Sequence, residues 1–428
     1  MQLKKDTSRQ NLVKPGQAVL ALALLLAPAI TYGQNGTLDI SFGTGGKAAT
    51  DLPGSVAVQA DGKLVVAGSA PTIDGSSNFA VARYNSNGAI DASFGMGGKV
   101  TTDFGGRFQG ATSVALQPDG KIVAAGGGVI NQFNDFALAR YNSDGTLDTS
   151  FGSGGKVLTN IGGVSAQARS LAVQPDGKIV VAGYANVGGG ENFELVRYNS
   201  NGTLDASFGT GGEVTTDFGL LDQGFSFAQA FSLVLQQDGK MVLAGQAFIG
   251  EGNDFALARY NSNGTLDTSF GTGGKVITDF GTTSDGAHSI AVQPDGKIVT
   301  AGLARNRFAL ARYNSDGTLD ISFGTGGKVI SVIAGLNDQA SRVALQRDGK
   351  ILVAGRSFIN GAFHSALARY NSWGTLDAGF GAGGKVTTIF GGDSDQVSSI
   401  AIQSDGKIVV SGGATIDWTN SFALARFN

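Results

Sequence analysis

Three short motifs recur seven times along the chain, always in the same order, and this repetition constrains the fold more than any other feature. The first motif, Asp-Gly-Lys, begins at Asp61, Asp119, Asp176, Asp238, Asp295, Asp348 and Asp405. The second resembles FALARYN and places its arginine at Arg83, Arg140, Arg197, Arg259, Arg312, Arg369 and Arg426. The third resembles GTLDxSFGxGGKV and places its aspartate at Asp39, Asp91, Asp148, Asp205, Asp267, Asp320 and Asp377. Successive copies lie about 57 residues apart, so a repeat architecture replaces the separate domains that length alone would suggest.

One unit, residues 156–198, contains four segments with the pattern of β-strands. KVLTNI is short and rich in β-branched residues, and RSLAVQ alternates apolar and polar residues. KIVVAG is continuously apolar, as expected of a strand that is covered on both faces. FELVRY places Phe193, Leu195 and Arg197 on one side of its strand. The FALARY copies have two alanines on the opposite side, where a neighbouring sheet could approach closely.

Four strands per unit and seven units predict an all-β fold, a seven-bladed β-propeller with four-stranded antiparallel blades. The first unit begins at Asn35-Gly36 and the last ends at Asn428, at the same phase of the repeat. We therefore expect the N-terminal segment GTLDISFGTGG to dock on the last blade and close the ring. An open β-solenoid is the alternative, although its coils are usually shorter and need capping.

The combination of GTLDxSFGxGGKV, QPDGKIVVAG and FALARYN resembles the delta-60 repeat family of secreted bacterial β-propellers, and the resemblance covers essentially everything after residue 33. The family implies a propeller fold and an extracytoplasmic setting. It implies no agreed activity and supplies no catalytic residues. Many relatives carry an additional C-terminal sorting or anchoring module, whereas this chain ends on a predicted propeller strand.

Residues 1–33 differ from the rest of the chain and predict a secretory signal peptide, so the propeller is expected to span residues 34–428. Four basic residues precede the apolar run AVLALALLLAPAI, and small residues follow it. The run is short for a membrane span, although a permanent N-terminal anchor is the alternative. Export would place the mature chain outside the cytoplasm, either secreted, in a periplasm or at the cell surface.

The net charge and the lack of cysteine exclude several classes of partner and of site. Beyond residue 33 the chain carries 27 Lys and Arg against 33 Asp and Glu, a net charge of −6, which argues against a nucleic acid partner. The chain has no cysteine, which excludes disulfides, lipid attachment and thiolate metal sites. We expect a monomeric propeller with no membrane span in the mature chain.

The repeated motifs are expected to build the fold rather than to carry chemistry. Asp-Gly is a strong turn signal between two strands, and FGxGGK lacks the spacing of a phosphate loop. NSDGTLD resembles part of a calcium loop, but its glycine comes too early and Trp373 replaces the residue before this glycine in one copy. Calcium at Asp144 or Asp316 stays open. The repeated arginine and the aspartate of GTLD are expected to form ion pairs between blades.

Signals for an enzyme are few, and we predict no catalytic residue and no cofactor. The two histidines, His288 and His364, do not recur in other units. His288 takes a position held elsewhere by Thr112 and Arg169, which predicts a surface residue. No nucleophile elbow and no HExxH motif is present. A site assembled from separate loops would leave no local motif, so enzymatic activity stays open.

Alternating strand direction divides the loops between two faces of the propeller. The Asp-Gly-Lys and GTLD loops share one nearly uniform face, and the variable loops share the other. An asymmetric site needs loops that differ, and binding residues tend to lie on loops held by a rigid scaffold. We therefore predict a binding module that recognises a protein or carbohydrate through the variable face. Its candidate residues are Asp222, Phe225, Phe227, Arg305, Arg307, Asp393, Asp395 and Trp418. A hydrolase or lyase with a dispersed site at the central channel is the alternative.

Overall fold

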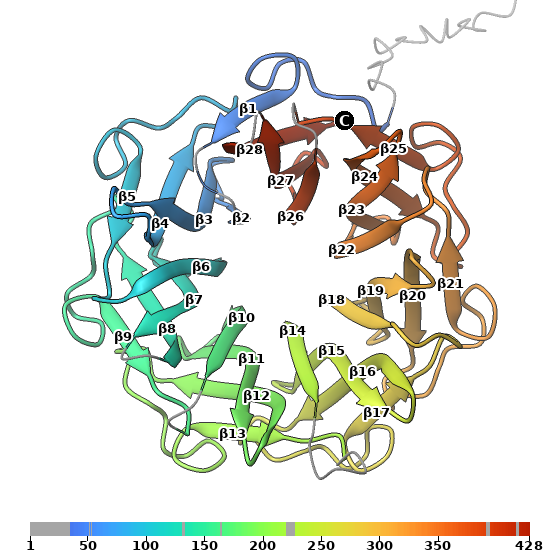
Figure 1. Ribbon diagram of the computed structural model, residues 1–428, viewed down its shortest axis with the longest axis horizontal. Helices are drawn as coiled ribbons and strands as arrows, with labels where there is room; N and C mark the ends of the chain where they lie inside the picture. The colour runs from blue at the N-terminus through green and yellow to red at the C-terminus, as the bar shows by residue number, and fades with distance from the viewer. Residues whose placement is uncertain are drawn as a thin grey trace, which may run out of the picture. The chain divides into compact units, whose positions relative to one another are not determined.

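The computed structural model describes residues 35–50, 52, 54–130, 133–162, 165–219, 227–390, 394–416 and 419–428. These residues form seven four-stranded antiparallel sheets that are arranged as a ring (Figure 1). The sheets are the blades of a seven-bladed β-propeller, which confirms the predicted fold.

The blades are numbered here in chain order. Their strands are β2 (Gly54–Val58), β3 (Leu64–Pro71), β4 (Ser77–Tyr84) and β5 (Lys99–Thr102) in blade 1; β6 (Arg107–Leu116), β7 (Ile122–Ile130), β8 (Phe133–Tyr141) and β9 (Lys156–Thr159) in blade 2; β10 (Ala166–Val173), β11 (Ile179–Val187), β12 (Gly190–Tyr198) and β13 (Glu213–Thr216) in blade 3; β14 (Ala228–Leu235), β15 (Met241–Ile249), β16 (Gly252–Tyr260) and β17 (Lys275–Thr278) in blade 4; β18 (Gly286–Val292), β19 (Ile298–Ala304), β20 (Arg307–Tyr313) and β21 (Lys328–Ser331) in blade 5; β22 (Asp338–Leu345), β23 (Ile351–Ile359), β24 (Ala362–Tyr370) and β25 (Lys385–Thr388) in blade 6; and β26 (Asp395–Ile402), β27 (Ile408–Ile416), β28 (Thr419–Phe427) and β1 (Lys47–Thr50) in blade 7.

A sequence unit is offset from a blade by one strand. The unit 156–198 begins with the segment that becomes β9, and β9 pairs with β8 in blade 2 rather than with a strand of blade 3. The reason is the third motif, which follows β8 and turns the chain back along the same sheet before it crosses to the next blade. The innermost, second and third strands of blade 3 come from RSLAVQ, KIVVAG and FELVRY, as predicted.

The N-terminal segment closes the ring as predicted. Strand β1 pairs with β28 in the register Lys47↔Ala425 to Thr50↔Phe422, so the outermost strand of blade 7 comes from the start of the propeller. Main-chain bonds extend this pairing, because the N–H of Asp39 donates to the carbonyl of Arg426 at 2.8 Å. The two ends of the ring are therefore joined by the same ladder that joins strands within a blade.

Neighbouring blades pack through the alanine side of the third strand. Ala137, Ala139 and Tyr141 of blade 2 are buried in one cluster with Val65 of blade 1, which agrees with the predicted close approach of the sheets. The Tyr141 hydroxyl also bonds to the Thr102 hydroxyl of blade 1 at 2.8 Å. Equivalent tyrosine–threonine bonds between adjacent blades are Tyr198–Thr159, Tyr260–Thr216 and Tyr313–Thr278.

The Asp-Gly-Lys loops form the predicted tight turns. Asp176 Oδ1 accepts a hydrogen bond from the Lys178 N–H at 3.1 Å. Gly177 has a φ of +82°, a conformation that glycine adopts without steric cost. The same aspartate-to-N–H bond occurs in the other six copies, so the aspartate holds the turn.

The lysine of this motif is part of a repeated ion-pair group. Asp205 Oδ2 lies 2.8 Å from Arg197 Nε and 2.8 Å from Lys178 Nζ. All three residues belong to blade 3, so the prediction of an ion pair between blades was wrong for these residues. The third motif folds back onto its own sheet and brings Asp205 beside Arg197. The contact between blades comes from the other side of the guanidinium, where Arg197 Nη1 donates to the main-chain carbonyl of Ser262 in blade 4.

The predicted signal peptide, residues 1–33, lies outside the described residues and stays a prediction. In the part of the chain that the structure describes, no helix has the length and apolar character needed to cross a bilayer.

Candidate functional site in the central channel

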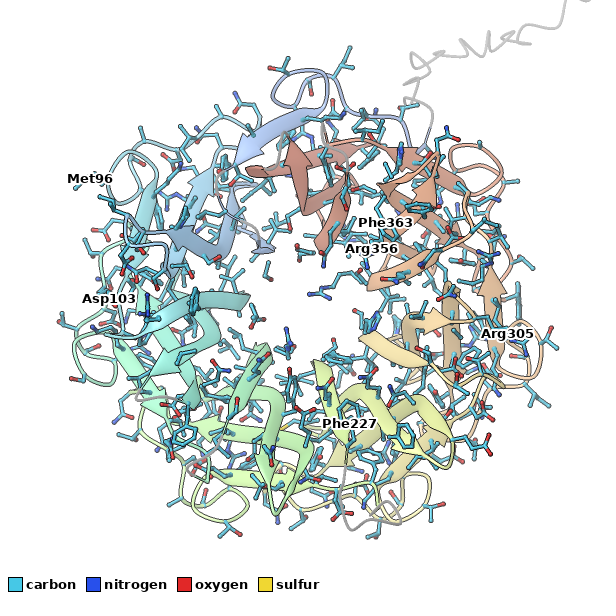
Figure 2. The ribbon with its side chains drawn as sticks, in the orientation of Figure 1. Met96, Asp103, Phe227, Arg305, Arg356 and Phe363 are labelled. Carbon is cyan, nitrogen blue, oxygen red and sulfur yellow. The ribbon has the colours of Figure 1, made fainter. Side chains whose placement is uncertain are left out.

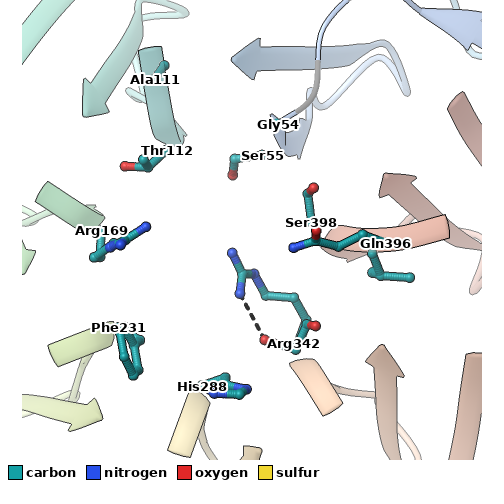
Figure 3. Close-up of a pocket in the computed structure, with 12 residues that line it drawn as sticks. Gly54, Ser55, Ala111, Thr112, Arg169, Phe231, His288, Arg342, Gln396 and Ser398 are labelled. Carbon is teal, nitrogen blue, oxygen red and sulfur yellow. Dashed lines mark hydrogen bonds between the residues drawn. The ribbon is translucent and has the colours of Figure 1, made fainter. Parts of the chain in front are cut away.

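The innermost strands of the blades surround a central cavity of about 360 Å³ (Figure 3). In blades 2 to 7 the innermost strand contains a one-residue register shift, for example between Ala168 and Ser170. Such a β-bulge redirects one side chain relative to its neighbours. The bulge residues are Thr112, Arg169, Phe231, His288, Ser341 and Ser398, and all of them line the cavity.

Two arginines extend into this cavity from different blades (Figure 3). Arg169 on β10 donates through Nη2 to the Tyr184 hydroxyl at 3.0 Å, and its Nε is buried without a hydrogen-bond partner among the described residues. Arg342 on β22 donates through Nη1 to the carbonyl of Ser341 at 2.8 Å. Burial, with a further contribution from the charge of Arg169, lowers the pKa of Arg342 to about 10, so Arg342 is cationic at neutral pH.

His288 is the third basic side chain in the cavity wall. Its Nδ1 lies 2.8 Å from the carbonyl of Ala340. A carbonyl can only accept, so Nδ1 carries the hydrogen and Nε2 of the neutral ring is left as an acceptor. Burial lowers the pKa of His288, and the charges of Arg342 and Arg356 add to this effect. The imidazole is therefore neutral at pH 7. The expected surface position was wrong, because the bulge turns His288 into the channel.

No carboxylate in the described lining of this cavity balances the positive charge of its arginines. The described residues that line it include Arg169, Arg342 and His288 but no Asp or Glu. Hydroxyl groups, such as those of Thr112 and Ser55, and the ring of Phe231 complete the lining. Two guanidinium groups in a partly dehydrated space attract an anion more strongly than they would at an open surface. The arrangement is therefore suited to an anionic group.

The site residues predicted from the variable loops lie elsewhere. Figure 2 shows Phe227 and Arg305 at the start of blade 4 and in blade 5, and neither lines the central cavity. Arg305 is exposed at the tip of the β19–β20 hairpin, where it has a φ of +54°. Arg307 is half-buried, and its Nη1 lies 3.8 Å from Asp338 Oδ2 and donates to the carbonyl of Gly335 at 3.0 Å. Binding through these residues stays a prediction.

Asp395 differs from Phe227, Arg305 and Arg307 because it is fully buried. It begins β26 instead of lying on the loop, and its Oδ2 accepts the N–H of Phe390 at 2.8 Å. Burial raises the pKa of Asp395. The carboxylate thus fixes the connection into blade 7 from within the fold. The remaining candidates, Asp222, Phe225, Asp393 and Trp418, lie outside the described residues.

Asp144 and Asp316, the acids considered for calcium, form hydrogen bonds within their own turns. Asp144 Oδ1 accepts hydrogen bonds from the N–H and the hydroxyl of Thr146, at 2.9 and 2.7 Å. Asp316 makes the same two bonds to Thr318. These bonds give both aspartates a role in turn formation.

One sequence signal could have identified the channel residues. The innermost strands are similar in all units, yet the bulge position changes from threonine to arginine, phenylalanine or histidine. The next position is serine in six blades and Arg342 in blade 6. Four of these serines accept a main-chain N–H from the next blade, namely Ser113, Ser170, Ser232 and Ser289. Arg342 replaces a structural hydroxyl with a charge that faces the cavity.

The solved structures that are similar to this chain are distant from it in sequence. A protein from Lactobacillus plantarum is 13% identical, with a TM-score of 0.51 over 82% of this chain and 90% of its own. The polysaccharide lyase Uly1 is 12% identical, with a TM-score of 0.50 over 94% of each chain. Sqt1 from Chaetomium thermophilum is 14% identical, with a TM-score of 0.49 over 92% of this chain and 98% of its own. At such identities the likeness concerns the fold alone.

Family comparison covers the repeats directly. No curated protein matches the sequence. The model of a family described as a domain of unknown function (DUF5122) β-propeller matches seven segments, which are residues 59–94, 117–151, 174–208, 236–270, 293–323, 346–380 and 403–428. These segments contain the Asp-Gly-Lys turns and the FALARYN strands of all seven units, and together they span more than half of the chain. The chain therefore belongs to the DUF5122 β-propeller family.

Proposed function

We propose that this protein is an extracytoplasmic binding module that takes an anionic group of its ligand into the central channel. The observation that carries the proposal is the meeting of Arg169 and Arg342 in one cavity whose described lining has no carboxylate. Guanidinium groups bind carboxylate, sulfate or phosphate through paired N–H donors. The nearby hydroxyls and the ring of Phe231 offer the polar and apolar contacts that a sugar ring uses, so the ligand class is an acidic glycan. The signal-like sequence of residues 1–33 supports the extracytoplasmic setting.

Titration calorimetry of the purified protein against acidic and neutral glycans tests this function. The decisive variant is Arg342→Ser, because the other six blades have serine at this position and the strand tolerates it. Loss of one charge-assisted contact is expected to weaken binding about tenfold or more, and added salt is expected to weaken binding to the unchanged protein.

Arg305→Ser is the matched control, since it removes an exposed arginine from the variable face. Binding that is lost in Arg305→Ser and kept in Arg342→Ser would move the site to the variable loops and refute the channel site. Binding of acidic peptides without any binding of acidic glycans would replace the proposed ligand class.

His288 favours a second candidate function, a lyase that acts on an acidic polysaccharide. Its neutral ring leaves Nε2 free to accept a proton, and the arginines beside it are suited to neutralise a substrate carboxylate. In such an elimination, Nε2 takes the proton next to the carboxylate, and the electron pair forms a carbon–carbon double bond. The bond to the leaving oxygen breaks, and this oxygen then takes a proton from water. A distantly similar propeller is named a polysaccharide lyase.

Ultraviolet absorbance of the unsaturated product distinguishes the two functions. A lyase is expected to generate this product from an acidic polysaccharide, and His288→Gln is expected to abolish turnover while ligand binding persists. Binding without turnover would support the binding module and exclude the lyase. Turnover that survives in His288→Gln would exclude this histidine as the base.

A further inference from the structure

Three acidic side chains meet at the interface between blades 4 and 5, outside the central channel. Asp254 lies near the start of β16, Asp279 directly follows β17, and Asp285 directly precedes β18. Each offers a carboxylate oxygen within 4.8 Å of the oxygens of the other two. Two of the three carboxylates are buried, and Asp279 is exposed.

Among the described residues, no hydrogen-bond donor or ion-pair partner offsets the cost of burying the carboxylate of Asp254. Its exposed fraction is 7%, and no hydrogen bond or ion pair from the described residues reaches its carboxylate. Asp285 accepts the Phe280 N–H at 2.9 Å and the Thr282 hydroxyl, and Asp279 accepts the Gly281 N–H. A buried carboxylate without a donor, facing two further carboxylates, is strongly unfavourable unless a cation or a proton balances it. Burial and the charges of its two neighbours raise the pKa of Asp254 to about 6.

The equivalent positions at other blade interfaces show how an acid is normally accommodated there. Asp254 corresponds to Asp135 in blade 2, since the next residue in each case, Phe255 or Phe136, pairs with a threonine on the outermost strand. At three other interfaces, an acid at one of the three positions equivalent to Asp254, Asp279 and Asp285 faces a donor at another of them. These pairs are Gln109 with Asp103 at 2.9 Å, Asn160 with Asp135 at 2.8 Å, and Arg307 with Asp338 at 3.8 Å. Between blades 4 and 5 all three of these positions hold an acid.

The nearby basic side chains are placed by main-chain contacts and not by the three acids. Lys328 Nζ donates to the carbonyl of Asp279 at 2.5 Å. The equivalent lysine makes the same contact where no acid is present, because Lys385 Nζ donates to the carbonyl of Val332 at 3.3 Å. Arg305 Nη2 donates weakly to the carbonyl of Phe280 at 3.4 Å. Among the described residues, neither base forms an ion pair within 4.0 Å of the three carboxylates.

We propose that Asp254, Asp279 and Asp285 bind a hard divalent cation, of which calcium is the best match. Calcium prefers oxygen ligands and tolerates the irregular geometry of a site that is completed by carbonyls and water. A cation here would tie blade 4 to the 280–285 connection that leads into blade 5. This site is independent of the proposed anion site, because none of its residues lines the central cavity.

The test uses the full chain, freed of metal with a chelator and titrated with CaCl₂ alone. Equilibrium dialysis is expected to give one calcium per chain, and the melting temperature is expected to rise with calcium. Asp254→Asn is expected to weaken calcium binding at least tenfold while raising the melting temperature without calcium, because it removes a repulsive charge. The fold accepts this change, since Asn192 takes the same position in blade 3.

Two further variants make the result decisive. Asp279→Asn places asparagine where blade 2 has Asn160, and it is expected to weaken binding as well. Asp144→Asn, in an exposed turn that resembles a calcium loop, is expected to bind calcium as tightly as the unchanged protein. The proposal is overturned if the unchanged protein shows no calcium response, or if both Asp254→Asn and Asp279→Asn keep the full response.

Discussion

Glu194 provides the sharpest test of how burial controls this fold, because it is a fully buried acid in a position that is apolar elsewhere. Its exposed fraction is 0%, and the other six blades have alanine at this position. One oxygen accepts the Thr215 hydroxyl at 2.8 Å, and the other is buried without a partner among the described residues. Glu213, which replaces the lysine of the other blades, lies close by. Burial, with the charge of Glu213 adding to it, raises the pKa of Glu194 from 4.5 to about 8.

The sign of the pH effect follows from this shift. Below pH 4.5 both the folded and the unfolded chain are protonated at Glu194, so its contribution is constant. Between pH 4.5 and 8 the unfolded chain loses the proton and the folded chain keeps it, so stability falls as the pH rises. At 1.36 kcal/mol per pKa unit, the loss reaches ~4–5 kcal/mol and then levels off above pH 8.

Glu194→Gln keeps the shape of the protonated acid and cannot ionise. We expect it to match the unchanged protein at pH 4.5 and to exceed its free energy of unfolding by ~4 kcal/mol at pH 9. Urea unfolding followed by circular dichroism across this pH range measures the difference. The exposed Glu251→Gln serves as the control and is expected to leave the pH dependence unchanged. Parallel curves for Glu194→Gln and the unchanged protein would refute the reasoning.

Two further changes probe the repeated ion pairs. Arg259→Ala removes the 2.8 Å contact to Asp267 and is expected to lower the free energy of unfolding by ~3 kcal/mol without altering ligand binding; lost binding in a fully folded variant would contradict this. Asp39 lies in the segment that closes the ring, and hydrogen bonds from Lys407 and Ser41 outweigh its burial and hold its pKa well below the usual range. The contribution of Asp39 to the free energy of unfolding is therefore present above pH 4 and is lost as the pH falls further. Asp39→Asn is therefore expected to unfold at lower urea at pH 7 and to approach the unchanged protein near pH 2, and a difference that does not depend on pH would contradict this assignment.

Much of the fold could be predicted because it depends on residues that are close together in the sequence. The Asp-Gly turns need a positive φ at glycine, the buried strands need continuous apolar residues, and the alanines allow close packing. The ion-pair partners were also identified, but their placement within one blade depends on how the third motif folds back. The position of Asp395 was missed for a related reason, since β26 begins earlier than its polar sequence indicates.

The candidate site was harder to predict from the sequence. His288 was read as a surface residue because its neighbours in the pattern alternate normally, and periodicity does not reveal a one-residue bulge that redirects a side chain. Arg169 and Arg342 belong to blades 3 and 6, and nothing in either unit indicates that they share a cavity. The three acids between blades 4 and 5 likewise come from three separate segments.

The sequence by itself determined the number of blades, the number of strands per blade, the turn chemistry and the segment that closes the ring. Each of these follows from a local pattern that is repeated seven times. Only the tertiary structure decided which of the non-repeated side chains meet, such as Arg342 with Arg169 or Asp254 with Asp285. Closure of the ring and the bulges of the inner strands bring together residues that are far apart in the chain. A local pattern cannot predict these contacts, because it depends only on residues that are close together in the sequence.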